Sequence, residues 1–401
     1  MLAAGTQASS WLTAFSASLA AADVDAACGL FAPQCYWRDL VAFTWNVHTL
    51  QGRDAIRAML QTTLASVGSH SWALESEPKE EAGVIEAWFG FETAAGRGRG
   101  IVRLRDGRCW TLFTSLQELR GFEEPAGLRR AQGVVHVATR NRTTWAEERA
   151  QEAATLGTSR QPYCLIVGGG QGGLALAARL KRLHVPTLVI DRLARPGDAW
   201  RQRYKTLCLH DPVWYDHLPY LPFPDHWPVF TPKDKMGDWL EMYAKVMELA
   251  CWGDTECISA SHDPAAQGGA GQWTVQVRRE GQMLTLHPTQ LVLATGMSGL
   301  PQVPQLPGAS TFAGAQMHSS AFASAEPWRG KRCVVIGSNN SAHDICVSLW
   351  ENEAAEVILH AERGAGKVLI RMRDMNERSG RGWPRRNRPR RRNSCSSGPI
   401  R

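Results

Sequence analysis

The chain of 401 residues is 44% hydrophobic and 21% charged, which gives room for two or three domains of about 150 residues each. Its 37 glycines and 21 prolines are close to ordinary usage, which excludes a collagen-like or wholly disordered protein. No apolar run approaches the roughly 18 residues that a membrane span needs, so no transmembrane helix is expected.

The basic charge of the chain, +7 in total, is concentrated at its C-terminal end. Residues 362–401 contain 13 Lys/Arg and 3 Asp/Glu, whereas residues 1–361 contain 32 and 35. A basic tail can bind nucleic acid through phosphate charge. This tail, however, combines an Arg/Pro/Ser run with hardly any apolar periodicity. We therefore expect a disordered segment over 362–401 and no nucleic-acid partner.

Ten cysteines are spread thinly, with no C-x-x-C pair and no His/Cys cluster at zinc spacing. This usage predicts free thiols in a reducing compartment and no metal site. The Ala/Ser-rich start has no Lys or Arg before Arg38, whereas targeting peptides need early basic residues. We therefore expect no leader peptide and a cytoplasmic protein.

Residues 1–120 are predicted to form a small α+β domain that begins with helices. Apolar residues recur at helical spacing near the start and again over 54–67; they are Trp11, Leu12, Phe15 and Leu19, then Ile56, Met59, Leu60 and Leu64. Each set predicts an amphipathic helix with one buried face. A further helix is expected over 23–31, and a strand over 34–43.

From residue 84 onward the hydrophobic period changes to two. Apolar residues at 85, 87, 89 and 91 alternate with Glu86, Trp88, Gly90 and Glu92, which predicts a half-buried strand. Asp106-Gly107 then marks a hairpin turn between two further strands.

Helices followed by a curved antiparallel sheet resemble the nuclear-transport-factor-2-like (SnoaL-like) fold. That fold is a pocketed cone, used by some enzymes and by many dimerisation modules. The resemblance implies a homodimer through residues 1–120 and a cavity that Trp37, Asp39 and His48 could line. A purely structural role for these three residues is the alternative.

Residues 121–160 are polar and charge-mixed, with a break at Pro125-Ala126-Gly127. The segment 145–156 looks helical, and we expect this helix to dock along the next domain. The whole segment is therefore a predicted linker without chemistry of its own.

A dinucleotide-binding pattern begins at residue 163. An apolar strand over 163–167 is followed by Gly168-x-Gly170-x-x-Gly173, a helix over 172–183, a strand over 187–190 and Asp191. Gly168 permits the tight turn, Gly170 lets the backbone approach a pyrophosphate, and Gly173 lets helix and strand pack closely. The helix N-terminus attracts phosphate, and the Asp191 carboxylate accepts hydrogen bonds from ribose hydroxyls. This combination predicts a Rossmann-type unit over 161–325.

A second unit with the same order is predicted over 326–361. A strand over 333–336 leads into Gly337-x-Asn339-x-x-Ala342, a helix and a strand over 357–360. Asn is the non-glycine residue that best adopts a positive φ, and Ala is an accepted third residue of the motif. Two such folds imply two cofactors, FAD on the first and a nicotinamide dinucleotide on the second in the usual pairing. Thr295-Gly296 ends a strand where the chain crosses between them.

The predicted fold class is therefore α/β, with two Rossmann-type dinucleotide-binding units, the second incomplete, preceded by a small α+β cone-shaped domain.

Over about 160–360 the chain resembles the flavin-containing monooxygenases, including their YUCCA-like branch. The most specific motif is Phe312-x-Gly314-x-x-x-His318-x-x-x-Phe322, which Baeyer–Villiger enzymes usually end in Trp. Other matching stretches are Gly197-Asp198-Ala199-Trp200, RQRYKTLCLHDP from residue 201 and GSNNSAHDI from residue 337. A SnoaL-like domain fused ahead is a known arrangement in this group.

The resemblance implies an FAD-dependent, NADPH-using monooxygenase. Such an enzyme oxygenates a small organic substrate with molecular oxygen through a flavin C4a-hydroperoxide, and the cofactor carries the chemistry. FAD would lie on Gly168, Gly170, Gly173, Asp191, Thr295 and Gly296, with Trp200 and His210 near the flavin. NADP would lie on Gly337, Asn339, Ser341 and Ala342, and His318 would position the domain link or NADP. A satisfied buried histidine is the alternative for His318.

Members of this family continue well past the second unit, so we expect residues 362–401 to mark a truncated or frame-shifted chain. They also usually place Arg directly after the last strand of that unit. Here His360-Ala361-Glu362-Arg363 stands there, which makes Arg363 a candidate for the NADP 2′-phosphate. Two alternatives stay open. One is an inactive nucleotide-binding fragment; the other is an NAD(P)H flavoprotein reductase, which normally shows a redox-active C-x-x-C pair.

Overall fold

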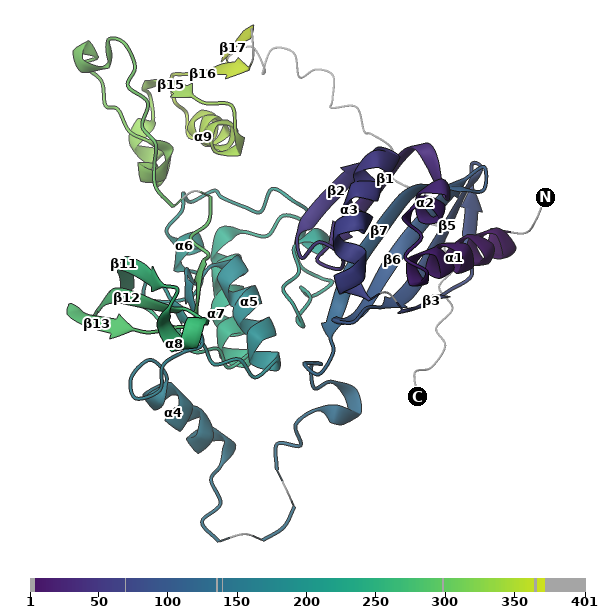
Figure 1. Ribbon diagram of the computed structural model, residues 1–401. Coiled ribbons are helices and arrows are strands. Elements are labelled where there is room, and N and C mark those ends of the chain that lie inside the picture. The colour runs from purple at the N-terminus through teal and green to yellow at the C-terminus, as the bar shows by residue number, and fades with distance from the viewer. Residues whose placement is uncertain are drawn as a thin grey trace. The chain divides into compact units, whose positions relative to one another are not determined.

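The computed structural model describes residues 4–68, 70–134, 136–138, 140–297, 299–363 and 366–371. The chain divides into two compact units, Met1–His136 and Val137–Arg401 (Figure 1). The disorder predicted for 372–401 lies outside the described residues. Among those that are described, no helix has both the length and the apolar character to cross a membrane.

Three helices lie on one face of the sheet in the first unit: α1 (Ala4–Ala20), α2 (Val24–Gly29) and α3 (Gly52–Val67) (Figure 1). The amphipathic pattern predicted for α1 and α3 is confirmed, because every apolar residue named for them is buried. Helix α2 is shorter than the predicted 23–31. Asp23 caps its N-terminus by accepting a hydrogen bond from the Ala26 amide, and the chain enters a strand at Phe31.

The sheet of the first unit has seven strands: β1 (Phe31–Leu40), β2 (Val47–Gln51), β3 (His70–Leu74), β4 (Lys79–Glu81), β5 (Val84–Glu92), β6 (Gly96–Arg105) and β7 (Arg108–Leu119). Their order is β2-β1-β7-β6-β5-β3, with β4 also paired to β5. Only β1 and β7 run parallel among these described pairs. Asp106 and Gly107 join β6 to β7 with φ of 52° and 71°, as the predicted hairpin turn requires.

Aromatic side chains fill the space between the helices and this sheet. The Phe15 ring lies 5.8 Å from the rings of Phe31 and Trp37, and Trp72 stacks on Phe91 at 4.8 Å. The alternation predicted for β5 is confirmed, because residues 85, 87, 89 and 91 face this interior and are buried. The first unit is therefore an antiparallel-rich α+β domain with a packed core.

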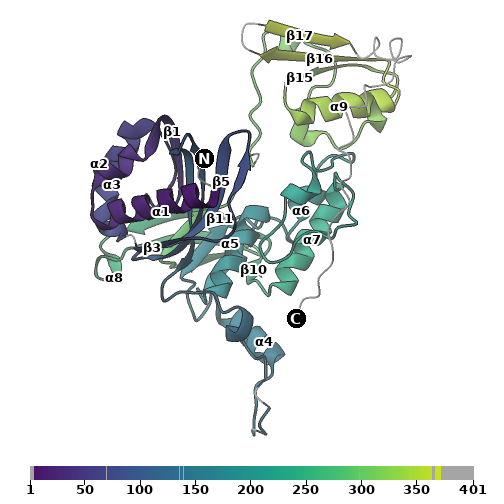
Figure 2. The same ribbon diagram turned by 90° about the vertical axis from the view of Figure 1, so that its right-hand side faces the viewer.

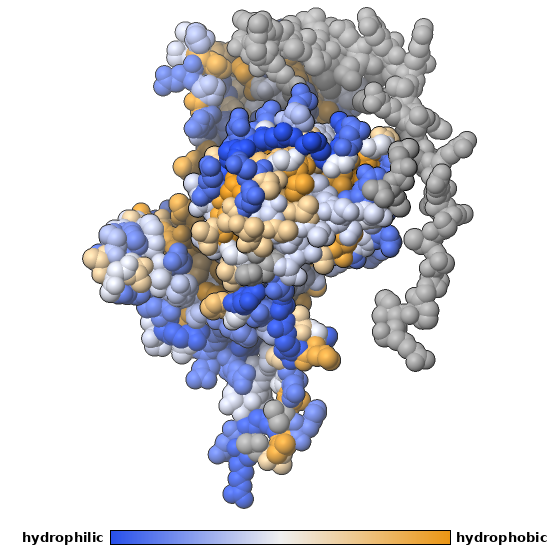
Figure 3. Space-filling model, turned by 45° about the vertical axis from the view of Figure 1, so that its right-hand side comes forward, coloured by the Kyte–Doolittle hydropathy of each residue, from blue (hydrophilic) through white to orange (hydrophobic). Residues whose placement is uncertain are grey.

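The second unit begins with α4 (Trp145–Thr155), which starts with a capping box between Thr144 and Glu147. The Trp145 indole donates to Glu248 at 2.6 Å, and Lys181 donates to Glu152 at 3.2 Å, so α4 docks on the helices that follow it. The lowest part of Figure 3, which is the loop below α4 in Figure 1, has a mainly hydrophilic surface with a few hydrophobic side chains.

A parallel sheet forms the centre of the second unit. Its strands are β8 (Cys164–Val167), β9 (Thr187–Ile190), β10 (Cys251–Trp252) and β14 (Gln290–Leu293), in the order β10-β9-β8-β14. This order equals the 3-2-1-4 arrangement of a Rossmann half, in which ligands bind at the carboxyl ends of the central strands. Helix α5 (Gln171–Arg182) connects β8 to β9, and α7 (Lys233–Val246) packs beside it.

A three-stranded antiparallel sheet covers the other face of the parallel sheet. It consists of β11 (Thr255–Asp263), β12 (Gln272–Arg279) and β13 (Gln282–Leu286), whose inward side chains join one core with those of β8 and β9. Short helices complete the unit and its connections: α6 (Asp198–Arg201), α8 (Ala266–Gly269), and 3-10 turns at Gly127–Arg129, Val213–Tyr215, Ala309–Thr311, Ser319–Ala321 and Glu326–Trp328.

The last described part is a β–α–β segment with one added strand. Strands β15 (Arg332–Ile336) and β16 (Glu356–Arg363) run parallel, α9 (Asn340–Glu351) connects them along one face, and β17 (Gly366–Arg371) pairs antiparallel with β16 (Figure 2). The disordered tail was predicted to begin at residue 362, which is too early, because β16 continues to Arg363 and β17 follows. Residues 366–371 complete a sheet edge, because β17 takes up the free backbone groups of β16.

Candidate functional site

Three glycines shape the turn between β8 and α5. Gly168 has φ of 117°, and a Cβ there would lie 2.3 Å from the Ala294 carbonyl oxygen. A Cβ on Gly173 would lie 2.0 Å from the Gly168 carbonyl oxygen, which is closer than these atoms can approach. A Cβ on Gly170 would meet nothing within 4 Å. The fold therefore requires Gly168 and Gly173, whereas Gly170 borders open space.

Asp191 ties this turn to the end of β9. One of its carboxylate oxygens accepts the Gly169 amide at 2.6 Å, and the other accepts the Leu193 amide at 2.8 Å. Gly170 is the N-cap of α5 and supplies no capping side chain. The first amides of α5 and the positive end of its dipole therefore face the open space.

Three further residues predicted for FAD, namely Trp200, Thr295 and Gly296, lie near the same turn. Trp200 donates its indole N–H to Gln171, the first residue of α5, at 3.3 Å. The Ala294 amide donates to the Val167 carbonyl at 2.8 Å, which brings Thr295 and Gly296 alongside Gly168. Gly296 has φ of 75°, so the chain turns away there as a glycine allows.

The second turn, between β15 and α9, uses a different geometry. Gly337 has φ of 155°, and a Cβ there would lie 3.2 Å from the Ala342 Cβ. The positive φ predicted for Asn339 is wrong: it has φ of −95°, because it is the N-cap of α9 and N-caps take extended backbone. Ser341 and Ala342 lie in the first turn of α9, the former half-buried and the latter buried.

His210 lies against α9, the helix of the second predicted dinucleotide-binding unit, and not beside the first glycine turn. Its Nε2 is 2.8 Å from Oδ2 of Asp344 on α9, and the Tyr204 hydroxyl donates to the same oxygen at 2.6 Å. Burial, followed by the hydrogen bond and charge of Asp344, raises the pKa of Tyr204 well above its ordinary value. Tyr204 is therefore a proton donor in this contact at any physiological pH.

The motif from Phe312 to Phe322 divides into exposed and buried ends. Phe312 is exposed, whereas Phe322 is buried with its ring 6.4 Å from that of Tyr204. His318 is half-buried, caps the turn Ser319–Ala321 and accepts the Ser320 amide at 3.2 Å. The histidine therefore fixes the local turn that leads Phe322 into the core.

Two cysteines of the second unit, the half-buried Cys251 and the buried Cys164, have raised pKa values. Burial, followed by the nearby Asp191 carboxylate, raises the pKa of Cys251 to about 12, and burial raises that of Cys164 to about 11. A thiol with so high a pKa is a poor nucleophile near neutral pH. In the part of the chain that the structure describes, no cluster of His, Cys, Asp and Glu could hold a metal ion.

The three candidates in the first unit do not line a cavity. Trp37 and Asp39 are fully buried: the Trp37 indole donates to the Thr114 hydroxyl, which donates to Asp39 Oδ1, both at 2.8 Å. Aromatic packing fills the space that a cone would leave open, and His48 is exposed on β2. Trp37 and Asp39 are therefore structural.

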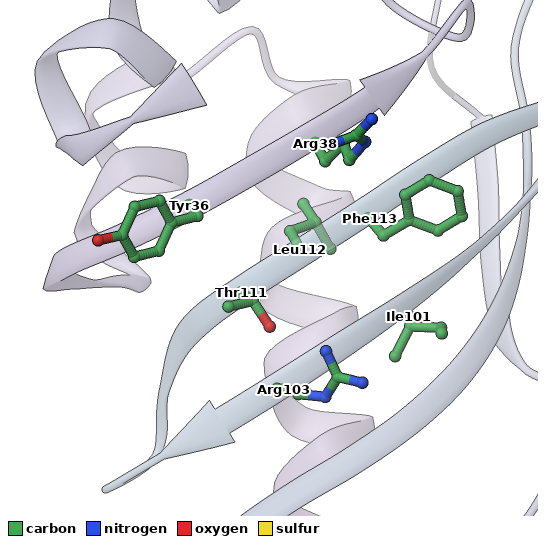
Figure 4. A pocket seen from close by; sticks show the side chains of 7 residues that line it. All are labelled: Tyr36, Arg38, Ile101, Arg103, Thr111, Leu112 and Phe113. Atoms are coloured by element: carbon green, nitrogen blue, oxygen red, sulfur yellow. The ribbon is translucent and has the colours of Figure 1, made fainter. Parts of the chain in front are cut away.

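One hollow in the described surface of the first unit lies on the other face of the sheet. A shallow depression of about 220 Å³ lies there between three neighbouring strands, with a helix visible behind the sheet (Figure 4). Its lining consists of Tyr36, Arg38, Ile101, Arg103, Thr111, Leu112 and Phe113.

The second unit matches known proteins. Residues 203–381 match the flavin-binding monooxygenase-like family, and residues 166–224 match the NAD(P)-binding Rossmann-like domain. Indole-3-pyruvate monooxygenase YUCCA1 of Oryza sativa subsp. japonica is 37% identical over 194 residues, which are 48% of this chain and 46% of that protein. Probable indole-3-pyruvate monooxygenase YUCCA9 of Arabidopsis thaliana is 34% identical over 192 residues, 47% and 45% of the two chains.

Among solved structures, a flavin-containing monooxygenase from Stenotrophomonas maltophilia shares 23% identity at a TM-score of 0.45, over 54% of this chain and 63% of that chain. The sequence matches make the C-terminal half of the chain flavin-containing-monooxygenase-like. Its homologues there belong to the YUCCA-like branch. The chain spans about half the length of the curated relatives it matches.

Sequence reasoning missed Tyr204 and Asp344 as a pair. Both stand in stretches that resemble the family, RQRYKTLCLHDP and GSNNSAHDI, but they are 140 residues apart. A polar residue inside each matching stretch was the available signal, and only the folded chain shows that the two meet.

Proposed function

We propose that the protein is an FAD-dependent monooxygenase that uses NADPH to oxygenate a small organic substrate. The observation that supports this most directly is the β8–α5–β9 turn with open space at Gly170, in a half of the chain that is homologous to flavin-containing monooxygenases. The two relatives are named for indole-3-pyruvate, so this 2-oxo acid is the first substrate to test.

The residues of the first turn fit FAD. Open space borders Gly170 at the uncapped start of α5, where a pyrophosphate gains amide donors and the helix dipole. Asp191 uses one oxygen for each of two backbone amides, and each oxygen keeps capacity for a ribose hydroxyl. In our proposal Gly168, Gly173, Thr295 and Gly296 shape this cradle, and Trp200 and His210 border the flavin.

The second turn is the proposed site of the nicotinamide dinucleotide. Asn339, Ser341 and the amides at the start of α9 offer polar groups, while Gly337 and Ala342 let the backbone come close. The structure describes the backbone of Arg363, at the end of β16. The proposed preference for NADPH over NADH therefore rests on the likeness to the family. When bound, the flavin accepts a hydride and activates molecular oxygen, and the chain supplies binding, orientation and exclusion of water.

The visible absorption spectrum of the purified chain, recorded before and after NADPH is added without oxygen, tests this proposal. We expect a bound flavin whose absorption bleaches with NADPH. Readmitted air should restore the spectrum, and an oxygenated product should appear when indole-3-pyruvate, a tertiary amine or a thioether is present.

The two alternatives give different spectra. An inactive nucleotide-binding fragment would hold flavin that stays yellow with NADPH, or take up no added FAD at all. A flavoprotein reductase would bleach but yield no oxygenated product with any of the three substrates. The sequence has no C-x-x-C pair, which favours the monooxygenase over a dithiol reductase.

We also propose that the chain forms a homodimer through the face of the first unit's sheet that carries the depression. Tyr36, Ile101 and Phe113 present apolar surface there, between the cations Arg38 and Arg103. Apolar surface rimmed by charge is typical of protein–protein contacts.

Phe113→Glu should turn such a dimer into a monomer, because the half-buried ring is replaced by a charge that the interface would have to desolvate. Light scattering coupled to gel filtration should then report the mass of one chain in place of two. Glu80→Gln, on the exposed strand β4, is the control that should leave the mass unchanged. A wild-type chain that elutes as a monomer at micromolar concentration would rule the dimer out.

A further inference from the structure

The segment from Trp200 to His210 leaves the first glycine turn and enters the core around α9. Tyr204 and Leu207 are buried there with Ile345, Leu349 and Val357 of the β15–α9–β16 segment. Trp200 packs both against this cluster and against the cluster around α7. One short segment therefore holds the two predicted dinucleotide units together.

A carboxylate on α9 is the polar centre of this contact. Asp344 Oδ2 accepts the Tyr204 hydroxyl at 2.6 Å and faces His210 Nε2 at 2.8 Å. A single oxygen of Asp344 therefore serves two partners on the segment from Trp200 to His210. Hydrogen bonds to a charged acceptor are about twice as strong as neutral ones. The side chain of Asp344 is only 30% exposed, so solvent replaces these bonds poorly.

A backbone hydrogen bond and a surface ion pair also hold the segment from Trp200 to His210 in place. The Lys205 amide donates to the Ala323 carbonyl at 2.9 Å, and the Lys205 ammonium lies 2.6 Å from the Glu326 carboxylate. The ion pair is exposed, and solvent and salt screen exposed pairs strongly. The Lys205 amide, bonded to the connection that leads into β15, is therefore the better reporter of whether this segment stays docked.

The contact lies between the two glycine turns. Asp344 follows Ala342 of the second turn by two residues, and Trp200 donates to Gln171 at the first residue of α5. Contacts thus run from the start of α5 through Trp200 and the buried cluster that contains Tyr204 to the first turns of α9. Any rotation of α9 about this contact would displace one turn relative to the other.

We propose that Asp344 is a positioning residue that holds the second dinucleotide unit on the first through Tyr204 and His210. This rests on the proposed function, in which the two cofactors occupy the two turns and must meet for reduction of the flavin. Displacement of reacting groups by about 1 Å can cost on the order of 100-fold in rate, so a docking contact of this kind controls reduction by setting the distance between the two turns.

Hydrogen–deuterium exchange of the full chain tests the docking itself. In Asp344→Ala, peptides that contain the Lys205 amide should exchange about ten-fold faster, because local opening becomes easier. Tyr204→Phe and His210→Gln should each give part of this effect, while peptides of α5 keep the wild-type rate. Glu351→Gln removes a carboxylate from the exposed end of the same helix and is the matched control. Unchanged exchange in Asp344→Ala would overturn the proposal.

Stopped-flow reduction by saturating NADPH without oxygen tests the positioning role. Asp344→Ala should retain its FAD and its dependence on NADPH concentration but bleach about ten-fold more slowly. Tyr204→Phe should slow flavin reduction when introduced into the wild-type chain. It should add little to the effect of Asp344→Ala, because the two substitutions remove the same contact. An unaltered bleaching rate in a variant with faster exchange would refute positioning. A wild-type flavin that never bleaches would instead refute the proposed function, and the exchange data would still decide whether Asp344 docks the two units.

Discussion

Gly173→Ala is expected to destroy the FAD cradle. Its new Cβ would lie 2.0 Å from the Gly168 carbonyl oxygen, and both atoms belong to backbone that cannot turn away as a flexible side chain does. Helix α5 would have to move off β8, and overpacking of this kind costs about 3 kcal/mol. We expect the purified variant to be colourless and to melt at a lower temperature, as measured by flavin absorption and by thermal unfolding.

Substitutions at two neighbouring glycines distinguish an effect on folding from an effect on flavin binding. A Cβ at Gly172 meets nothing within 4 Å, so Gly172→Ala should keep the flavin and stabilise the helix by up to about 1 kcal/mol. A Cβ at Gly170 also meets nothing within 4 Å, but it would occupy the space assigned to the pyrophosphate. Gly170→Ala should therefore keep the fold and lose the flavin. Full flavin content in Gly170→Ala would show that the pyrophosphate lies elsewhere.

Local patterns in the sequence predicted the elements that local physics decides. Helical spacing in α1 and α3, alternation in β5 and the strand–glycine–helix order of β8 and α5 all depend on neighbours a few residues apart. The parallel pairing of β1 with β7 and the addition of β17 to β16 join residues by sheet contacts that no periodicity encodes. Those pairings consequently had no signal in the sequence.

The candidate site likewise contains residues that local patterns identify and residues that meet only in the folded chain. The need for glycine at 168 and 173 was predictable, because the turn and the close packing of helix on strand leave no room for a Cβ there. The roles of Gly170 and Asp191 toward a cofactor stay predictions. The negative φ of Asn339 was not predictable, since its type tolerates either sign and the helix start decided between them. Asp344 and Tyr204 meet only after the chain has folded, so their pairing had to come from the structure.

Asp39 shows the same limit in the first unit, where a buried carboxylate was interpreted as a cavity candidate. Its Oδ1 accepts the Thr114 hydroxyl at 2.8 Å, and its Oδ2 accepts the amides of Phe43 and Thr44 at 3.0 and 2.9 Å. The Thr44 hydroxyl also donates to Oδ2, at 2.8 Å. Both oxygens are thus fully used in holding the end of β1 against β7 and the turn that follows.

Asp39→Ala is expected to destabilise the first unit by about 4 kcal/mol, because it leaves several buried donors without an acceptor and each such loss costs about 1–3 kcal/mol. Asp39→Asn should lower the free energy of unfolding nearly as much, because the NH2 group of the asparagine would face N–H and O–H groups that also donate. Asp23→Ala is the matched control: it removes one exposed capping bond to Ala26 and should cost about 1 kcal/mol. Hydrogen exchange of the β1 and β7 amides in increasing urea would measure all three. Equal losses for Asp39→Ala and Asp23→Ala would contradict the structural role, whereas retained flavin in the second unit of Asp39→Ala would show that the damage stays within the first.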